Sequence, residues 1–190
     1  MKHIAIFASG SGTNAEQIAK YFAEKQTAKV SLILTNNKNA YVLERAKKLN
    51  IPSRIFTREE FYKSDNILGL LKENNIEMLV LAGFLWLIPD NLIKAYPNKI
   101  VNIHPALLPK YGGKGMYGSK VHEAVIEAGD KESGISIHYV NEKYDEGKII
   151  FQAKVNIEAG DTAETLAQKI HGLEYEFFPK IVEEVIINPK

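Results

Sequence analysis

Short apolar runs alternate with segments of helical periodicity through the first hundred residues, and this rhythm constrains the fold more than any other feature. The apolar runs are typical of buried strands and span residues 2–8, 28–35, 53–56, 77–83 and 100–104. The segments between them have helical spacing and span residues 15–24, 41–49, 59–75 and 90–96. Strands joined by helices in this way form right-handed crossovers. The sequence therefore predicts an α/β fold, a Rossmann-like, mainly parallel sheet with helices on both faces.

The pattern changes after Pro109. Residues 110–118 contain four glycines and little apolar periodicity, which is typical of an irregular loop. A short helix is expected at 121–128. Two strand-like segments, 134–140 and 148–155, then predict a late antiparallel hairpin.

The last part of the chain has the pattern of a long C-terminal helix. Its apolar residues step by three and four from Ala163 to Ile181. Asp161 and Glu164 have the spacing of a capping box at its start. The sequence has no internal repeat, low-complexity tract or linker, so we expect residues 1–190 to form a single domain.

The composition excludes several classes of protein. With 24 Lys and Arg against 23 Asp and Glu, the chain has no general attraction for nucleic acid or anionic membranes. It contains no cysteine, which excludes disulfides, thiolate metal sites and a thiol nucleophile. The apolar run at the N-terminus is too short for the apolar region of a signal peptide, and no apolar stretch approaches the length of a membrane span. We therefore expect a cytoplasmic protein that binds small molecules, with no nucleic acid or membrane partner.

Two polar side chains interrupt the apolar run at 100–104. Asn102 and His104 are two residues apart, so on a strand they point to the same side. His104 stands at the carboxyl end, where open α/β sheets bind their ligands. The alternative is that both are core polar groups satisfied by neighbouring loops. This strand alone leaves catalytic and structural interpretations open.

The loop after the first apolar run has the spacing of an anion-binding site. Residues 10–15, GSGTNA, fit the pattern G-x-G-x-x-A between a strand and a helix, where backbone N–H groups can approach a phosphate. A dinucleotide enzyme would also carry an acidic residue near the end of the second strand, but residues 34–37 are LTNN. We therefore predict phosphate binding without a dinucleotide. The alternative is a loop that only caps the helix.

Two further segments belong to a site only if the fold brings them to it. Asp145 lies in the polar loop 144–147 and can serve its own turn, or it can face His104 and raise the pKa of that histidine. Residues 84–88 are too apolar for an exposed loop and predict either core packing or the wall of a pocket for a flat ring.

The histidines give no indication of a metal site. The other four, His3, His122, His138 and His171, have no metal-ligand spacing, and we interpret them as structural or surface residues. No metal is therefore expected.

Taken together, the motifs resemble those of the phosphoribosylglycinamide formyltransferases, the folate-dependent transformylases of purine biosynthesis. GSGTN, AGF, VNIHPALLP, YDEG and HGLEYEFFP occur in the family's order over residues 2–179. The resemblance implies the formyltransferase fold and transfer of a formyl group from 10-formyltetrahydrofolate, the co-substrate, to glycinamide ribonucleotide. We expect no metal to be needed for this reaction, and we expect a monomer or homodimer.

The resemblance implies roles for individual residues. The catalytic residues would be Asn102, His104 and Asp145. The residues holding glycinamide ribonucleotide would be Gly12, Thr13, Asn14, His171 and Glu174. The folate contacts would be Arg58, Leu85, Trp86, Leu87, Ile88, Asn102, Asn141, Glu142, Lys143, Tyr144 and Asp145. Trp86 stands where many members carry arginine.

The mechanism expected from these roles is attack of the substrate amine on the formyl carbon, through a tetrahedral intermediate. Protonated His104 and the Asn102 amide would donate hydrogen bonds to its oxyanion, and His104 with Asp145 would move the protons. Sugar-nucleotide and methionyl-tRNA formyltransferases and formyl-folate hydrolases share the catalytic motif. These usually have further domains, which this chain is not expected to contain. A non-catalytic nucleotide-binding α/β module is the alternative from another class.

Overall fold

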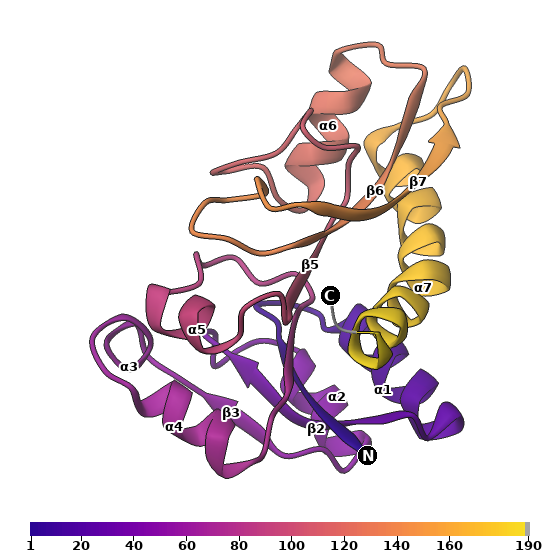
Figure 1. Cartoon of the computed structure of the whole chain (residues 1–190). Helices are drawn as coiled ribbons and strands as arrows, with labels where there is room; N and C mark the ends of the chain where they lie inside the picture. The colour runs from indigo at the N-terminus through magenta and orange to yellow at the C-terminus, as the bar shows by residue number, and fades with distance from the viewer. Residues whose placement is uncertain (189–190) are drawn as a thin grey trace.

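The computed structural model describes residues 1–188, which build one seven-stranded sheet in the order β3-β2-β1-β4-β5-β6-β7 (Figure 1). The neighbouring pairs from β3 to β5 are parallel, whereas β5, β6 and β7 pair antiparallel. The strands are β1 (Lys2–Phe7), β2 (Ala28–Thr35), β3 (Ser53–Ile55), β4 (Met78–Leu81), β5 (Ile100–His104), β6 (Glu132–Tyr139) and β7 (Ile149–Asn156). The predicted sheet with its late hairpin is confirmed.

Helices cover both faces of this sheet, as predicted (Figure 1). The helices are α1 (Thr13–Lys25), α2 (Val42–Lys48), α3 (Arg58–Tyr62), α4 (Asn66–Glu73), α5 (Asp90–Ala95), α6 (Ser119–Glu127) and α7 (Ala163–Ile187). One apolar cluster lies under α1, α2, α6 and α7, and the other under α3, α4 and α5. No helix within residues 1–188 combines the length and apolar character that a membrane span needs.

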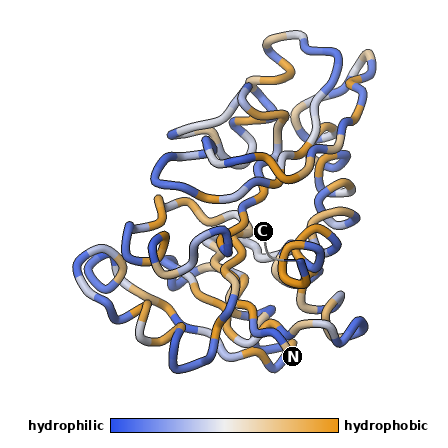
Figure 2. The backbone as a smooth tube through the Cα atoms, in the orientation of Figure 1, coloured by the Kyte–Doolittle hydropathy of each residue, from blue (hydrophilic) through white to orange (hydrophobic). Residues whose placement is uncertain are grey.

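The central strands are apolar throughout because both of their faces are covered. In β1, Ile4 and Ile6 join one cluster, while Ala5 and Phe7 join the other, and all four are fully buried. Figure 2 shows the same arrangement, with apolar chain in the middle of the fold and hydrophilic segments at its outer turns. The carboxyl ends of β1, β4 and β5 therefore meet at one edge, where the loops that follow them can form a site.

The helix expected at residues 59–75 is divided in two in the structure. The segment 59–75 was expected to form one helix, but it forms α3 and α4, because Ser64 makes hydrogen bonds that compete with the helix. Its hydroxyl donates to the Glu60 carbonyl at 2.9 Å and accepts from the Asn66 N–H at 3.3 Å. The chain therefore turns between the two helices.

The capping box of the last helix is formed by other residues than expected. Thr162, rather than Asp161, is the N-cap of α7, and its hydroxyl accepts from the Thr165 N–H at 3.3 Å. The Thr165 hydroxyl in turn accepts from the Thr162 N–H at 2.8 Å. Asp161 instead pairs with Lys169 at 2.6 Å, which lowers the pKa of its carboxyl to about 2.

Candidate active site

A cavity of about 840 Å³ opens at the carboxyl edge of the sheet. Its walls come from the loop after β1, the ends of β4 and β5, residues 113–119 and α7. Among the residues named from the sequence, it is lined by Gly12, Thr13, Asn14, Leu85, Asn102, His104, Tyr144, Asp145, His171 and Glu174. The fold thus brings the three expected catalytic side chains and all five expected ribonucleotide contacts to one cavity.

Other residues expected to contact the folate lie away from this lining. Within residues 1–188, the lining does not include Arg58, Trp86, Leu87, Ile88, Asn141, Glu142 or Lys143. Ile88 is only 3% exposed and belongs to the apolar core. The Arg58 guanidinium lies over the rings of Trp86 and Tyr62, at 5.6 and 5.4 Å from their centroids. A folate contact for these residues stays a prediction.

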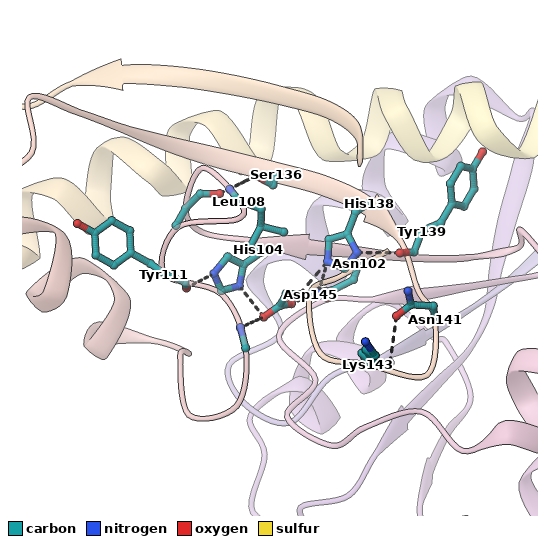
Figure 3. Close-up of polar contacts among 12 residues, drawn as sticks. Asn102, His104, Leu108, Tyr111, Ser136, His138, Tyr139, Asn141, Lys143 and Asp145 are labelled. Carbon is teal, nitrogen blue, oxygen red and sulfur yellow. Dashed lines mark hydrogen bonds and ion pairs between the residues drawn. The ribbon is translucent and has the colours of Figure 1, made fainter. Parts of the chain in front are cut away.

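His104 is held at the end of β5 by a backbone carbonyl. Its Nε2 lies 2.7 Å from the Tyr111 carbonyl oxygen (Figure 3). A carbonyl oxygen can only accept a hydrogen bond, so Nε2 carries a proton and donates it. The other ring nitrogen, Nδ1, lies 3.6 Å from Asp145 Oδ2. His104 therefore faces the carboxylate through Nδ1.

The expected rise in the pKa of His104 is not found. The side chain is almost fully buried, and this burial lowers its pKa below the usual 6.5 because the charged form loses its hydration. The charge of Asp145 and the Tyr111 carbonyl act in the opposite direction but do not outweigh burial. His104 is therefore mostly neutral at neutral pH in the free protein, whereas the mechanism expected from the sequence uses its protonated form.

Asp145 is fixed in the loop between β6 and β7 by contacts at both carboxylate oxygens. The Gly113 N–H donates to Oδ2 at 2.9 Å, and His138 Nε2 lies 3.6 Å from Oδ1 (Figure 3). Burial would raise the pKa of this carboxyl, but His138 and His104, when they are protonated, and the Gly113 N–H lower it below its usual range. Asp145 is therefore an ionised carboxylate inside the cavity.

The start of α1 and the middle of α7 form the other end of the cavity. Asn14 Nδ2 donates to Glu174 Oε2 at 2.9 Å, and His171 Nδ1 lies 3.0 Å from the same oxygen. This contact with Glu174 raises the pKa of His171. The free N–H groups of the first helical turn favour a negatively charged ligand here.

Three of the four histidines interpreted from their spacing as structural or surface residues lie at the site: His171, which the family resemblance implied, and His122 and His138, which it did not. His122 is 4% exposed and lines the cavity, and its Nδ1 has no hydrogen-bond partner within residues 1–188. His138 is 2% exposed and lies opposite Asn102 in the pairing of β5 with β6. His138 could have been predicted only from the register in which the first strand of the hairpin pairs with the 100–104 strand, because that register places it beside Asn102. Across residues 1–188, no cluster of three or more metal-ligating side chains occurs.

Comparison with known proteins gives one consistent family. The model of the formyl transferase family matches residues 2–182. The phosphoribosylglycinamide formyltransferase of Bacillus subtilis is 37% identical, with 98% of this chain and 95% of that protein covered. The chloroplastic enzyme of that name from Arabidopsis thaliana is 40% identical over 95% of this chain, which spans only 64% of the plant protein.

Solved structures agree with the sequence comparison. The crystal structure of phosphoribosylglycinamide formyltransferase from Bacillus halodurans superposes with a TM-score of 0.87 at 38% identity, covering 100% of this chain and 97% of that one. The corresponding protein from Anaplasma phagocytophilum has a TM-score of 0.90 at 33% identity, covering 98% and 87%. This chain therefore belongs to the formyl transferase family and, within it, to the phosphoribosylglycinamide formyltransferases.

Proposed function

We propose that this chain transfers the formyl group of 10-formyltetrahydrofolate to the amine of glycinamide ribonucleotide, a reaction of purine biosynthesis. One observation carries the proposal. Asn102, His104 and Asp145 converge at a cavity that also includes the start of α1. A phosphate site and a proton-transfer site in one cavity suit a phosphorylated amine as the formyl acceptor.

The ribonucleotide half of the proposed site uses the loop before α1 and two residues of α7. Gly12, Thr13 and Asn14 line the cavity where N–H groups at the start of the helix are available to a phosphate. His171, whose pKa is raised by Glu174, adds positive charge to this end of the cavity when it is protonated. The phosphate would bind there, and the amine would reach toward His104.

The folate half of the proposed site lies on the side of Leu85 and Tyr144, which both line the cavity. These side chains offer apolar and aromatic walls for a flat ring. Apart from buried Ile88, the remaining folate contacts expected from the sequence would lie beyond this lining. In the proposed reaction no metal takes part.

The chemistry begins when the neutral amine attacks the formyl carbon. A C–N bond forms, the carbonyl electron pair moves to oxygen, and the attacking nitrogen becomes positively charged. Neutral His104 can accept the excess proton on Nδ1 through a bridging water, and Asp145 at 3.6 Å stabilises the resulting imidazolium. The proton then passes to N10 of the folate as the bond between N10 and the formyl carbon breaks.

The oxyanion of the intermediate needs a hydrogen-bond donor. The Nε2–H of His104 now donates to the Tyr111 carbonyl, so the formyl oxygen would take the place of that carbonyl. A donor of this kind is worth about 3 kcal/mol in the transition state. His104 would thus serve the oxyanion with one nitrogen and the proton transfer with the other.

A direct test mixes the protein with 10-formyltetrahydrofolate and glycinamide ribonucleotide and follows the folate absorbance as tetrahydrofolate forms. We expect turnover that depends on the ribonucleotide, and a loss of kcat of about 100-fold or more in His104→Ala. His3→Gln, at the opposite end of the sheet, is the control and should keep its kcat. Turnover only with a sugar-nucleotide amine or methionyl-tRNA, or binding without turnover, would refute the proposal.

A further inference from the structure

The NH₂ group of the Asn102 side chain faces two hydrogen-bond acceptors. Its Nδ2 lies 3.0 Å from His138 Nε2 and 3.4 Å from Asp145 Oδ1 (Figure 3). An amide NH₂ group has two protons, and each of these contacts can use one. The donor end of Asn102 is therefore committed to the protein.

The proton on His138 is located by a second contact. Its Nδ1 lies 2.8 Å from the Tyr139 carbonyl oxygen, which can only accept, so Nδ1 carries the proton. That carbonyl is held in place, since the Tyr139 N–H donates to the Lys148 carbonyl at 2.9 Å. The backbone of Gly147 also passes so close to the Tyr139 oxygen that a side chain at 147 would not fit. With the proton on Nδ1, Nε2 has a free lone pair for Asn102.

The opposite orientation of the amide is unfavourable. It would place the Asn102 carbonyl oxygen beside the carboxylate of Asp145, which accepts hydrogen bonds, and beside the lone pair of His138. Two acceptors facing a third repel one another in a buried site. His138 and Asp145 together therefore select the orientation in which Nδ2 points toward them.

We infer that His138 is a positioning residue, which with Asp145 turns the carbonyl oxygen of Asn102 toward the substrates, where it accepts a hydrogen bond from the attacking amine. The inference rests on the proposed function, since it names the partner of Asn102 in that reaction. Asn102 lines the cavity, and no donor within residues 1–188 is bonded to its Oδ1. In this proposal Asn102 accepts a hydrogen bond from the amine, whereas the mechanism expected from the sequence has its amide donate to the oxyanion.

An acceptor at this position favours the transition state over the bound substrates. As the new C–N bond forms, the nitrogen gains positive charge and its N–H groups become stronger donors. The Asn102 carbonyl can hold one of these protons while another passes to His104, so its hydrogen bond strengthens during attack. Asn102 would therefore act on the nucleophile and His104 on the oxyanion.

Kinetics of two variants test the role of His138. His138→Gln can keep an acceptor for the Asn102 amide, whereas His138→Phe keeps a buried ring without one. We expect kcat to fall by about 10- to 100-fold in His138→Phe, with little change in KM for the ribonucleotide and substantial recovery in His138→Gln. His3→Gln is the matched control. Wild-type kcat in His138→Phe, or equal losses in both variants, would overturn the role.

Nuclear magnetic resonance tests the orientation without turnover, so it separates this inference from the proposed function. In the full chain labelled with ¹³C and ¹⁵N, Nδ1 of His138 should carry a proton and Nε2 should accept a hydrogen bond. On titration with glycinamide ribonucleotide, the ¹³Cγ signal of Asn102 should shift as its carbonyl accepts a hydrogen bond, while its Nδ2 protons stay bonded. A proton on Nε2 of His138, or a response confined to the Nδ2 protons of Asn102, would overturn the inference.

Discussion

Replacement of Gly12 by alanine should destabilise the protein through two separate effects. Gly12 precedes α1 with φ +73°, a left-handed conformation that side chains disfavour. A Cβ at this position would also collide with Val42, which is fully buried at the start of α2. It would lie 2.6 Å from the Val42 Cβ and 2.9 Å from its Cα, so a rotamer change of Val42 cannot relieve the overlap.

Gly83 separates the two effects. It has the same φ of +73°, but a Cβ there would meet no atom within 4 Å. Gly83→Ala should therefore lower the free energy of unfolding by the conformational cost alone, about 1–2 kcal/mol. Gly12→Ala adds the cost of overpacking, about 1–3 kcal/mol. The total expected for Gly12→Ala is therefore about 2–5 kcal/mol.

Urea unfolding followed by circular dichroism measures both variants against wild type. Gly12→Ala should unfold at a clearly lower urea concentration than Gly83→Ala. The slope of the unfolding free energy against urea concentration should be similar in the two variants. Because Gly12 belongs to the proposed phosphate loop, its variant should also show a raised KM for glycinamide ribonucleotide. Equal destabilisation of the two variants would refute the reasoning, because it would mean that the loop moves away from Val42 at no cost.

Two further predictions concern ionisation. Asp145→Asn removes a charge that raises the pKa of His104, so this pKa should fall further in an NMR titration and kcat should drop by about 100-fold. The pKa of His104 is lower in the folded state than 6.5, so this group lowers the free energy of unfolding as the pH falls from 6.5 to the folded-state pKa. In Asp145→Asn this loss should continue to a lower pH. An unchanged titration of His104 in Asp145→Asn would contradict the prediction. Glu174→Gln should lower the pKa of His171, because Glu174 raises it in the folded state. The contact between these two residues stabilises the protein fully below pH 6.5, and this stabilisation is lost as the pH rises through the raised pKa of His171. The difference in unfolding free energy between wild type and Glu174→Gln should therefore narrow as pH rises, and a difference that widens would exclude the pairing.

Local patterns determined the architecture because secondary structure and burial leave a periodic trace in the sequence. The continuous apolar runs of β1 and β4 reflect strands covered on both faces, and their alternation with helices leads directly to a parallel sheet. The position of Asn102 and His104 at a strand end followed from the same patterns. The break at Ser64 did not, since it depends on individual hydrogen bonds that periodicity does not record.

The sequence by itself thus established the sheet, the strand-end histidine and, through motif resemblance, the family. Only the tertiary structure decided the protonation and hydrogen-bond partners of the site. The pKa of His104 depends on how deeply other segments bury it, and burial outweighs the nearby charge of Asp145. Likewise the orientation of Asn102 depends on His138, which lies on a different strand. Desolvation and electrostatic fields are sums over neighbours in space, so positions along the chain cannot supply them.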